Sequence, residues 1–390
     1  LTHPLIAGNG GGSIDVAMKH IDQLALCELP DIESGPLGLK RLIDDCVNFG
    51  TIPFSVLARH GFIAKSLLLS LISRKIVSQQ EIDLFMGGVK TIAGDMLDDI
   101  HLLRIGKVTR SGFMDKYGHL RPGTYDILSN RYDHSDSFDS LGKESEIIEE
   151  NTKPFEFSKE QIQKISQLIS EVGFSDISFE HFINYIKSAI AGREYGKFVF
   201  TKSVSAMLEL IADFGRANQL SRDEMSHVSV DEILQIGVES NGQGIEETLR
   251  EIAQENSARH TVTSAIRLPQ VLSDCLGVRV VPFQVSQPNF ITSKKINAES
   301  VYLGLHHNAT DLANRIVLIE NADPGYDWIF SQSISGLITK YGGANSHMAI
   351  RCAEFGIPAA IGCGEQRFDR LVKANRLSLD CAVGTVNPVH

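Results

Sequence analysis

The sequence predicts a multidomain protein in which a mostly α-helical N-terminal region is followed by a C-terminal α/β domain. Its 390 residues exceed one compact core, since a domain usually takes about 100–200 residues. Helical spacing and helix caps dominate the first 275 or so residues, whereas short β-rich runs begin after Gly277. We therefore expect a helical region at 1–284 and an α/β domain at 285–390.

The composition predicts a folded cytoplasmic protein that binds neither nucleic acid nor membrane. Hydrophobic residues make up 43% of the chain, and 37 basic against 48 acidic residues give a formal charge of −11. A chain this acidic has no general attraction to nucleic acids or anionic lipids. The longest apolar run is far shorter than the roughly 20 residues of a membrane span, and no signal peptide is visible. The six cysteines lack disulfide-framework or C-x-x-C spacing, as expected of reduced thiols.

Three capping boxes mark helix starts in the N-terminal region, because a serine there is followed three residues later by an acid or amide. They are Ser78–Glu81, Ser158–Gln161 and Ser221–Glu224. After Ser158 the apolar residues keep helical spacing up to Gly173, which predicts the end of that helix. Residues 207–214 predict another buried helix. The Ser-, Asp- and Glu-rich stretch near 135–153 predicts a solvated connection between two helical lobes.

The C-terminal region alternates β-rich runs with turns, which is typical of a small α/β domain of about 100 residues. We expect a hinge at 285–293 and one amphipathic helix that ends before Gly356. The predicted strands are 278–283, 300–304, 315–320, 336–339, 359–362 and 376–379.

One segment of this domain carries a pattern suited to phosphate chemistry. A buried strand ends at Thr339, and Gly342-Gly343 permits a tight turn. Asn345 or Ser346 then caps a helix, so that His347 lies in its first turn. Free backbone N–H groups and the helix dipole favour an anion at this point.

A neutral imidazole in this position is a competent nucleophile toward phosphorus near neutral pH. The N–H groups, with the hydroxyls of Ser346 and Thr339, would stabilise a phosphoryl group on His347. Two plainer interpretations fit the residues alone: a histidine early in a helix is usually a surface or capping residue, and such a helix start can also bind free phosphate without covalent chemistry.

The pattern Thr-x-x-Gly-Gly-x-x-Ser-His-x-Ala-Ile, followed by Gly-Ile-Pro-Ala and a further Gly, runs from Thr339 to Gly362 without a gap. It closely resembles the phosphohistidine swivelling domain of the phosphoenolpyruvate-utilising enzymes. The resemblance implies that His347 is transiently phosphorylated and that four neighbours support the phosphoryl group. These are Thr339, Gly342, Gly343 and Ser346. Arg351, at a position that varies in the family, is carried over only as a further supporting residue.

Within this family, domain order favours similarity to rifampicin phosphotransferase-type dikinases. Phosphoenolpyruvate synthase and pyruvate phosphate dikinase place a large barrel after the histidine domain, whereas this sequence ends at His390. The segment Tyr117–Asp126 is similar to a Tyr-Gly-His-Arg-x-Pro-x-Glu-Ile-Asp segment of the helical acceptor domain, but it inserts Leu120 and has Thr-Tyr in place of Glu-Ile. The acceptor is therefore expected to differ from an antibiotic.

The resemblance implies that His347 receives the β-phosphoryl group of ATP and passes it to a small hydroxyl-bearing acceptor bound by the helical region. ATP and its Mg²⁺ would bind an ATP-grasp domain, in cis upstream or in trans, which nothing in this sequence resembles. The absence of an initiator methionine agrees with such a missing part. Two alternatives stay open: a phosphocarrier that receives phosphate from a separate protein and has no small acceptor, and phosphoenolpyruvate synthase-like activity. A deep apolar pocket beside Tyr117–Asp126 would favour the enzyme.

Candidate acceptor-binding residues lie on the loop within that segment. Arg121 could bind phosphate oxygens, and His119 or Asp126 could take a proton from an acceptor hydroxyl. The equally weighted alternative is a structural turn held by an Arg–Asp pair.

Other polar and aromatic residues are expected to be structural. Asp95, Asp98 and Asp99 have the spacing of a metal-binding helix face, but a solvated surface is the commoner arrangement, and we predict no metal site. We expect His306-His307 on the surface and Trp328 in the α/β core.

Overall fold

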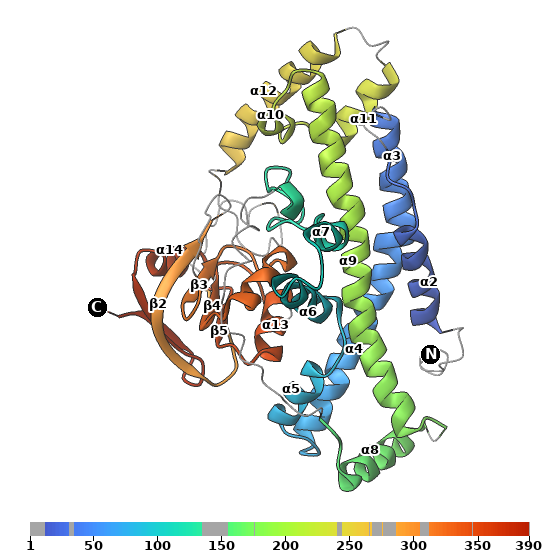
Figure 1. The fold of residues 1–390 in the computed structure, drawn as a ribbon, viewed down its shortest axis with the longest axis vertical. Coiled ribbons are helices and arrows are strands. Elements are labelled where there is room, and N and C mark those ends of the chain that lie inside the picture. Colours follow the sequence, from blue (N-terminus) through green and yellow to red (C-terminus); the bar gives the residue numbers. More distant parts are fainter. Residues whose placement is uncertain are drawn as a thin grey trace.

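The computed structural model shows an elongated helical body with a smaller α/β domain attached to one side (Figure 1). It describes residues 12–30, 35–134, 155–174, 176–239, 244–264, 266, 275, 286–304, 312–344 and 346–389. The prediction of a helical N-terminal region and a C-terminal α/β domain agrees with this architecture. The predicted strand 278–283, His306-His307 and the whole of the 135–153 connection lie outside the described residues.

Eleven α-helices form the described part of the helical body: α2 (Ser13–Ala25), α3 (Gly35–Cys46), α4 (Ile52–Ser73), α5 (Gln79–Gly87), α6 (Ile92–Arg104), α7 (Arg110–Tyr117), α8 (Lys159–Glu171), α9 (Phe179–Ala217), α10 (Arg222–Met225), α11 (Val230–Glu239) and α12 (Ile245–Ser264). All three predicted capping boxes are present, at the starts of α5, α8 and α10. α8 ends just before Gly173, whose φ of +90° suits glycine.

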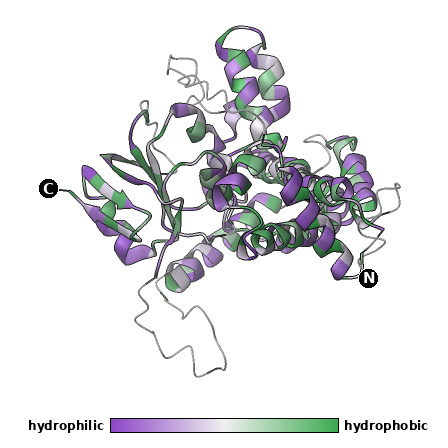
Figure 2. Ribbon diagram, turned by 90° about the horizontal axis from the view of Figure 1, so that it is seen from below, coloured by the Kyte–Doolittle hydropathy of each residue, from purple (hydrophilic) through white to green (hydrophobic). Residues whose placement is uncertain are grey.

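Helix α9 is a single long helix that runs nearly the full length of the helical body (Figure 1). It includes the predicted helix at 207–214. Gly196 allows close approach of α4, since a Cβ there would lie 2.9 Å from Leu57 Cδ1. Buried residues of α2, α4, α5, α8 and α9 form one hydrophobic cluster, so helices from both sides of the predicted 135–153 connection share a core. Figure 2 shows hydrophobic and hydrophilic residues alternating around these helices, as amphipathic packing requires.

α3 and α4 are joined by the π-helical turn η2 (Val47–Thr51) into one helical stretch, Gly35–Ser73. By length and composition this stretch could cross a membrane, and 33% of its most apolar window is buried in the fold. Leu57, Ala64 and Leu68 belong to the core shared with α9. The stretch thus contributes to the hydrophobic core, and the absence of a membrane partner stays a prediction.

The α/β domain is built on a seven-stranded sheet with the order β1-β5-β4-β3-β2-β6-β7. β2, β3, β4 and β5 are parallel neighbours, whereas β1, β6 and β7 pair antiparallel. Every residue of β3, β4 and β5 is buried, as expected of parallel strands covered on both faces. The elements are β1 (Asn289–Ile291), β2 (Lys295–Leu303), β3 (Ile316–Ile319), η6 (Pro324–Gln332, a 3-10 helix), β4 (Gly336–Thr339), α13 (His347–Glu354), β5 (Ala359–Ile361), α14 (Glu365–Leu371), β6 (Arg376–Asp380) and β7 (Thr385–Pro388).

Besides η6, three short elements of this domain were not predicted. β1 lies within the predicted hinge 285–293, because its three residues become a strand only by pairing with the edge strand β5. β7 contains Pro388, which weakens any strand signal but is tolerated at a sheet edge. α14 has only seven residues, too few for a clear helical period.

One turn of the α/β domain contributes to its contact with the helical body, beside other contacts such as that of Arg104 with the Ser331 carbonyl. The Tyr132 hydroxyl donates to the Gly325 carbonyl, and the Thr124 hydroxyl donates to the Asp323 carboxylate. Trp328 packs against both the α/β core and the cluster formed by α6 and α7, and so meets the expectation of a core position while also linking the two parts. These contacts make the loop after α7 a docking surface for the α/β domain.

Gly325→Ala is expected to separate the two parts. A Cβ at Gly325 would lie 1.7 Å from the Arg121 carbonyl oxygen, so the turn cannot stay docked without a shift of the backbone. Overpacking of this kind typically costs about 1–3 kcal/mol. Small-angle scattering should show a larger radius of gyration. Gly87→Ala is the matched control, because its Cβ would lie 3.9 Å from the Glu354 carbonyl, in ordinary contact. Equal radii for both variants would contradict the assignment.

Candidate active site

The loop before α13 can form only with glycines at two positions. Gly342 has φ of +128°, and a Cβ there would lie 2.8 Å from the Cβ of Ala322. A Cβ at Gly362 would lie 2.4 Å from the Gly342 carbonyl oxygen. This tight turn delivers the chain to Ser346, the N-cap of α13, so His347 is the first helical residue as predicted.

The supporting residues have different roles from those expected. Thr339 is fully buried; its hydroxyl donates to the Tyr341 carbonyl at 2.8 Å and accepts from the Gly362 N–H at 2.9 Å. The predicted hydrogen bond from Thr339 to a phosphoryl group is therefore wrong in this arrangement, since that hydroxyl braces the glycine turn. Ser346 Oγ is buried and has no hydrogen-bond partner among the described residues, so it remains available to a ligand. Gly343 faces open space.

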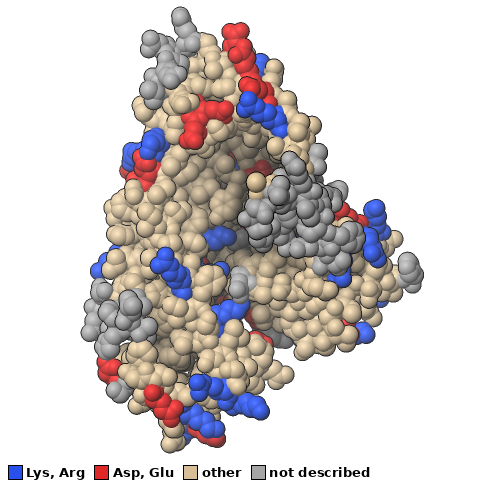
Figure 3. Space-filling view, turned by 180° about the vertical axis from the view of Figure 1, so that it is seen from behind, with Lys and Arg blue, Asp and Glu red and all other residues tan. Residues whose placement is uncertain are grey.

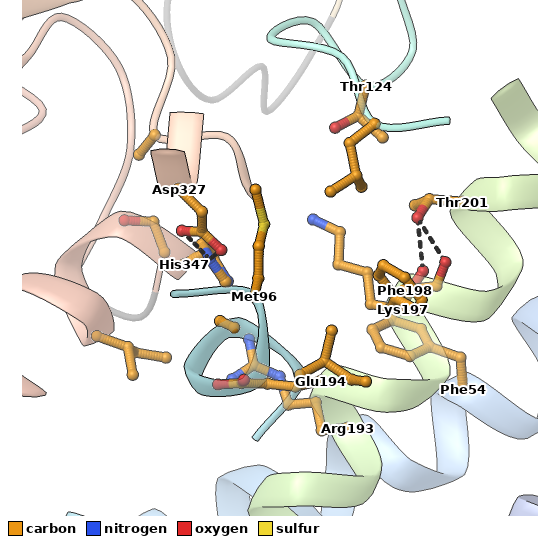
Figure 4. Close-up of a pocket in the computed structure, with 16 residues that line it drawn as sticks. Phe54, Met96, Thr124, Arg193, Glu194, Lys197, Phe198, Thr201, Asp327 and His347 are labelled. Atoms are coloured by element: carbon orange, nitrogen blue, oxygen red, sulfur yellow. Dashed lines mark hydrogen bonds and ion pairs between the residues drawn. The ribbon is translucent and has the colours of Figure 1, made fainter. Parts of the chain in front are cut away.

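His347 is held by a carboxylate that sequence analysis missed. Its Nε2 lies 2.7 Å from Oδ1 and 2.8 Å from Oδ2 of Asp327 (Figure 4). Asp327 comes from η6 and is 6% exposed. It stands 20 residues before the histidine in an unpredicted 3-10 helix, so no spacing rule marks it.

Arg351 lies one turn after His347 on α13 and close to Asp327. It is 3% exposed, pairs with Glu354 and stacks on the Phe355 ring at 4.5 Å. Its Nε lies 4.0 Å from Asp327 Oδ1. Arg351 is not among the residues that line the cavity described below. Its position therefore favours a role in holding Asp327 over direct contact with a phosphoryl group.

Glu354 is expected to make the stability of the chain depend on pH. Burial raises its pKa from 4.5 to about 7, Arg351 opposes this, and Glu194 of α9 adds to it. Because the folded chain binds this proton more tightly, the free energy of unfolding falls as the pH rises from about 4.5 to about 7. Glu354→Gln mimics the protonated side chain and should remove this contribution, which is at most about 3 kcal/mol.

Urea unfolding of both proteins near pH 5 and pH 7.5 measures this effect. The stability of Glu354→Gln relative to wild type should be greater at the higher pH, since the wild type has then lost its proton. The comparison cancels the titration of other groups, such as His119. An identical difference at both pH values would contradict the raised pKa.

His347 forms part of the wall of a cavity of about 290 Å³ between the α/β domain and the helical body. The facing wall is α9, where Arg193, Lys197 and Thr201 recur every four residues on one face. Figure 4 shows Lys197 extending from α9 into the cavity toward Asp327 and His347. Other lining residues are Phe54, Ile92, Ala93, Met96, Leu120, Thr124, Glu194, Phe198, Ala322, Ser346 and Ile350. Seen from behind, the molecule is hollowed where its two parts meet, with Lys and Arg side chains around the hollow (Figure 3).

The two cations of α9 are poised to bind an anion. Burial lowers the pKa of Lys197, and Asp323 and Asp327 partly offset this. Burial likewise lowers the pKa of Arg193, whose guanidinium stacks on Phe62 at 5.6 Å. Neither side chain forms a hydrogen bond or a close ion pair with another described residue. Partly buried cations without such partners are costly, so an anionic ligand would stabilise them.

The predicted acceptor residues His119, Arg121 and Asp126 do not line this cavity. Arg121 is 1% exposed, and its guanidinium donates to Ser205 and Glu209 of α9, each at 2.9 Å. Its predicted contact with an acceptor phosphate is wrong here, and its ionic partner is Glu209 rather than Asp126.

His119 and Asp126 contact neighbouring parts of the helical body instead of the cavity. His119 packs on Phe198, and burial lowers its pKa to about 3, which keeps the ring neutral. The Asp126 carboxylate accepts from the Leu128 N–H at 2.8 Å. Their neighbours Leu120 and Thr124 reach the cavity instead.

Asp95, Asp98 and Asp99 lie on α6, and no group of three or more potential metal ligands is found among the described residues. Asp99 accepts from Lys116 at 2.8 Å and from the Tyr117 hydroxyl at 2.7 Å. This pairing fixes α6 against α7.

The glycine turn and the helix that starts at His347 lie in a segment that matches a known class of domain. Residues 312–384 match the family model of the PEP-utilising enzyme mobile domain, and this part of the chain is such a domain. Over 75 residues the chain is 31% identical to phosphoenolpyruvate synthase of Escherichia coli (strain K12). That match covers 19% of this chain and only 9% of the relative. Domains of this family act in phosphoryl transfer through a histidine.

Proposed function

We propose that this chain is the acceptor-binding and histidine-carrying part of an ATP-dependent, dikinase-type phosphotransferase. His347 receives the β-phosphoryl group of ATP at an ATP-grasp domain, in cis or in trans, where Mg²⁺ accompanies the nucleotide. The α/β domain then docks on the helical body, and the phosphoryl group passes to a hydroxyl of a small molecule. The observation that carries this proposal is the placement of His347 on the cavity wall opposite Lys197 and Arg193.

The cavity has the parts that such a transfer needs. The N–P bond to His347 breaks as a bond forms between phosphorus and the acceptor oxygen, and negative charge is spread over the transferred group. Lys197 and Arg193 would neutralise this charge in a site that is partly shielded from water. Phe54 and Phe198 supply apolar surface for the acceptor.

The size of the cavity favours a small acceptor. Its volume of about 290 Å³ is at the lower end of the roughly 300–1,000 Å³ usual for ligand pockets. A large antibiotic would require the two parts of the chain to move apart. This supports the expectation, drawn from the altered Tyr117–Asp126 segment, of a different acceptor.

A concave cavity also favours the enzyme over a phosphocarrier, which would offer a flat docking face. The likeness to phosphoenolpyruvate synthase is confined to the mobile domain, so it supports the phosphohistidine step and gives no separate support for synthesis of phosphoenolpyruvate.

An untargeted metabolite screen tests this proposal. The full-length gene product is incubated with ATP and a metabolite extract, and mass spectrometry identifies any compound that gains one phosphate. The expected result is a small hydroxyl compound that gains phosphate together with the formation of AMP. Transfer of the phosphoryl group to another protein, with no phosphorylated metabolite, would establish the phosphocarrier instead. No acid-labile phosphate on the wild-type chain would refute both.

A further inference from the structure

We propose that the acceptor is a small uncharged alcohol with an apolar body and a single hydroxyl, and not a sugar, a hydroxy acid or a compound that already carries a phosphate. This inference rests on the proposed function and adds the chemical class of its acceptor. The cavity wall has three properties that favour this class: its charges are balanced, its hydroxyl protons are largely used within the fold, and apolar side chains reach it from several elements.

The cavity wall carries as many acids as cations among the described residues. Its cations are Arg193 and Lys197, and its acids are Glu194 and Asp327. Burial lowers the pKa of Lys197, which Asp323 and Asp327 oppose. Burial likewise lowers the pKa of Arg193, which Glu194 opposes. Each cation therefore has an acid nearby, and the wall is close to neutral before a phosphoryl group arrives.

A phosphoryl group on His347 would take up both cations of the wall. A protein-bound phosphate carries a charge of about −1.5 to −2 near pH 7, which two cations balance without surplus. Lys65, a further cation near Arg193, does not line the cavity and donates to the Ala344 carbonyl at 3.4 Å. A carboxylate or phosphate on the acceptor would thus face Glu194 with no cation of its own, which like charges oppose.

The hydroxyl side chains of the wall have few protons to offer a ligand. Thr201 donates its single proton to two carbonyls of its own helix, at 2.9 and 3.0 Å (Figure 4). Thr124 donates to the Asp323 carboxylate. The Ser346 hydroxyl has no partner in the described part of the chain, but it precedes the histidine and would serve the phosphoryl group. A polyol would therefore bury several hydroxyls with too few partners, which is costly.

Apolar side chains reach the cavity from four helices and one loop. They belong to α4, α6, the loop after α7, α9 and α13, and include Phe54, Ile92, Met96, Leu120, Phe198 and Ile350. Figure 4 shows Met96 between the pair of His347 with Asp327 and the side chain of Lys197. Hydrocarbon of the acceptor thus finds apolar surface right beside its reacting hydroxyl, and the flexible thioether can adapt to its shape.

The transfer itself needs only one hydroxyl. The hydroxyl oxygen forms the new P–O bond as the N–P bond to His347 breaks, and the ring nitrogen keeps the electron pair of that bond. The hydroxyl proton passes to the released imidazole, directly or through water. No second functional group of the acceptor takes part, so the reaction is compatible with an otherwise apolar molecule.

Two matched pairs of probe compounds test this class with the full-length gene product. Cyclohexanol and myo-inositol share a six-membered carbon ring but have one and six hydroxyls, and benzyl alcohol and mandelate differ by one carboxylate. Titrations followed by saturation-transfer difference NMR measure binding, and single-turnover loss of phosphate from ATP-charged His347 measures transfer. The uncharged compound with one hydroxyl should be preferred in each pair by about 5- to 150-fold or more, the cost of burying one polar group without a partner.

Leu120→Lys should weaken this preference in the second pair. The new ammonium would supply the cation that the wall lacks, so mandelate should bind about 10-fold or more tightly than it does to the wild type. Leu128→Lys is the matched control, because Leu128 is 38% exposed and does not line the cavity. It should bind mandelate as the wild type does. If Leu120→Lys does not fold, the two wild-type comparisons decide the question.

The outcomes separate this inference from the proposed function. Binding or transfer by the wild type that favours myo-inositol or mandelate, or no binding of either apolar probe, overturns the inference and leaves the proposed function standing. Mandelate binding that is unchanged in a folded Leu120→Lys variant also overturns it, because charge would then not decide the class. Absence of acid-labile phosphate on the chain after incubation with ATP overturns the proposed function instead, while the binding measurements still decide which class the cavity takes.

Discussion

Replacing His347 with glutamine is expected to abolish acid-labile labelling of the chain and to lower acceptor phosphorylation by about 10⁴-fold or more. Glutamine is similar in reach and can still donate a hydrogen bond to Asp327, but it has no nitrogen that can form the phosphorylated intermediate. Labelling of the full-length protein with ATP, with acid and base stability of the product, measures the first effect.

The control for this variant is His181→Gln, which changes an exposed histidine at the start of α9. It should label as the wild type does. Thermal unfolding should show that both variants remain folded. Equal labelling of His347→Gln and wild type would remove the basis of the proposed function.

Replacing Lys197 with methionine is expected to slow transfer to the acceptor by about 10²–10³-fold, as loss of one transition-state donor does in other enzymes. Methionine keeps much of the apolar side chain but loses the charge that faces the transferred group. Charging of His347 should be unchanged, because the proposed function places that step at another domain. The measurement is the single-turnover loss of phosphate from His347 with the acceptor that the metabolite screen identifies.

Lys202→Met is a matched control on the same helix, since Lys202 is exposed and does not line the cavity. Its transfer rate should equal that of the wild type. If Lys197→Met impaired charging and transfer alike, Lys197 would have a structural role rather than a place at the acceptor station.

The features that sequence analysis could predict are encoded in consecutive residues. A capping box needs only four positions, and the glycine turn that places His347 at a helix start is read from the nine residues Thr339–His347. Asp327 and Lys197 could not be found in this way, because only folding brings η6 and α9 to the cavity that His347 lines.

Arg121 shows the opposite limit of sequence analysis, because it looked like a ligand-binding residue and has a structural role. Its loop position suggested a ligand-binding arginine, but its carboxylate partner Glu209 lies 88 residues later on α9. As long as that partner is unknown, the local sequence of a buried structural arginine cannot be told from that of a catalytic one. The four-residue spacing of Arg193, Lys197 and Thr201 was a usable signal, since it marks one face of a helix.

Trp328 is the single tryptophan of the sequence, and its ring is shared between two cores. Undocking would transfer this indole from an apolar contact to water, and no other tryptophan would add to its emission. The molecule therefore carries an intrinsic fluorescent reporter of domain position, so the proposed cycle of charging and delivery can be followed in real time by the shift of the emission wavelength, without attached dyes.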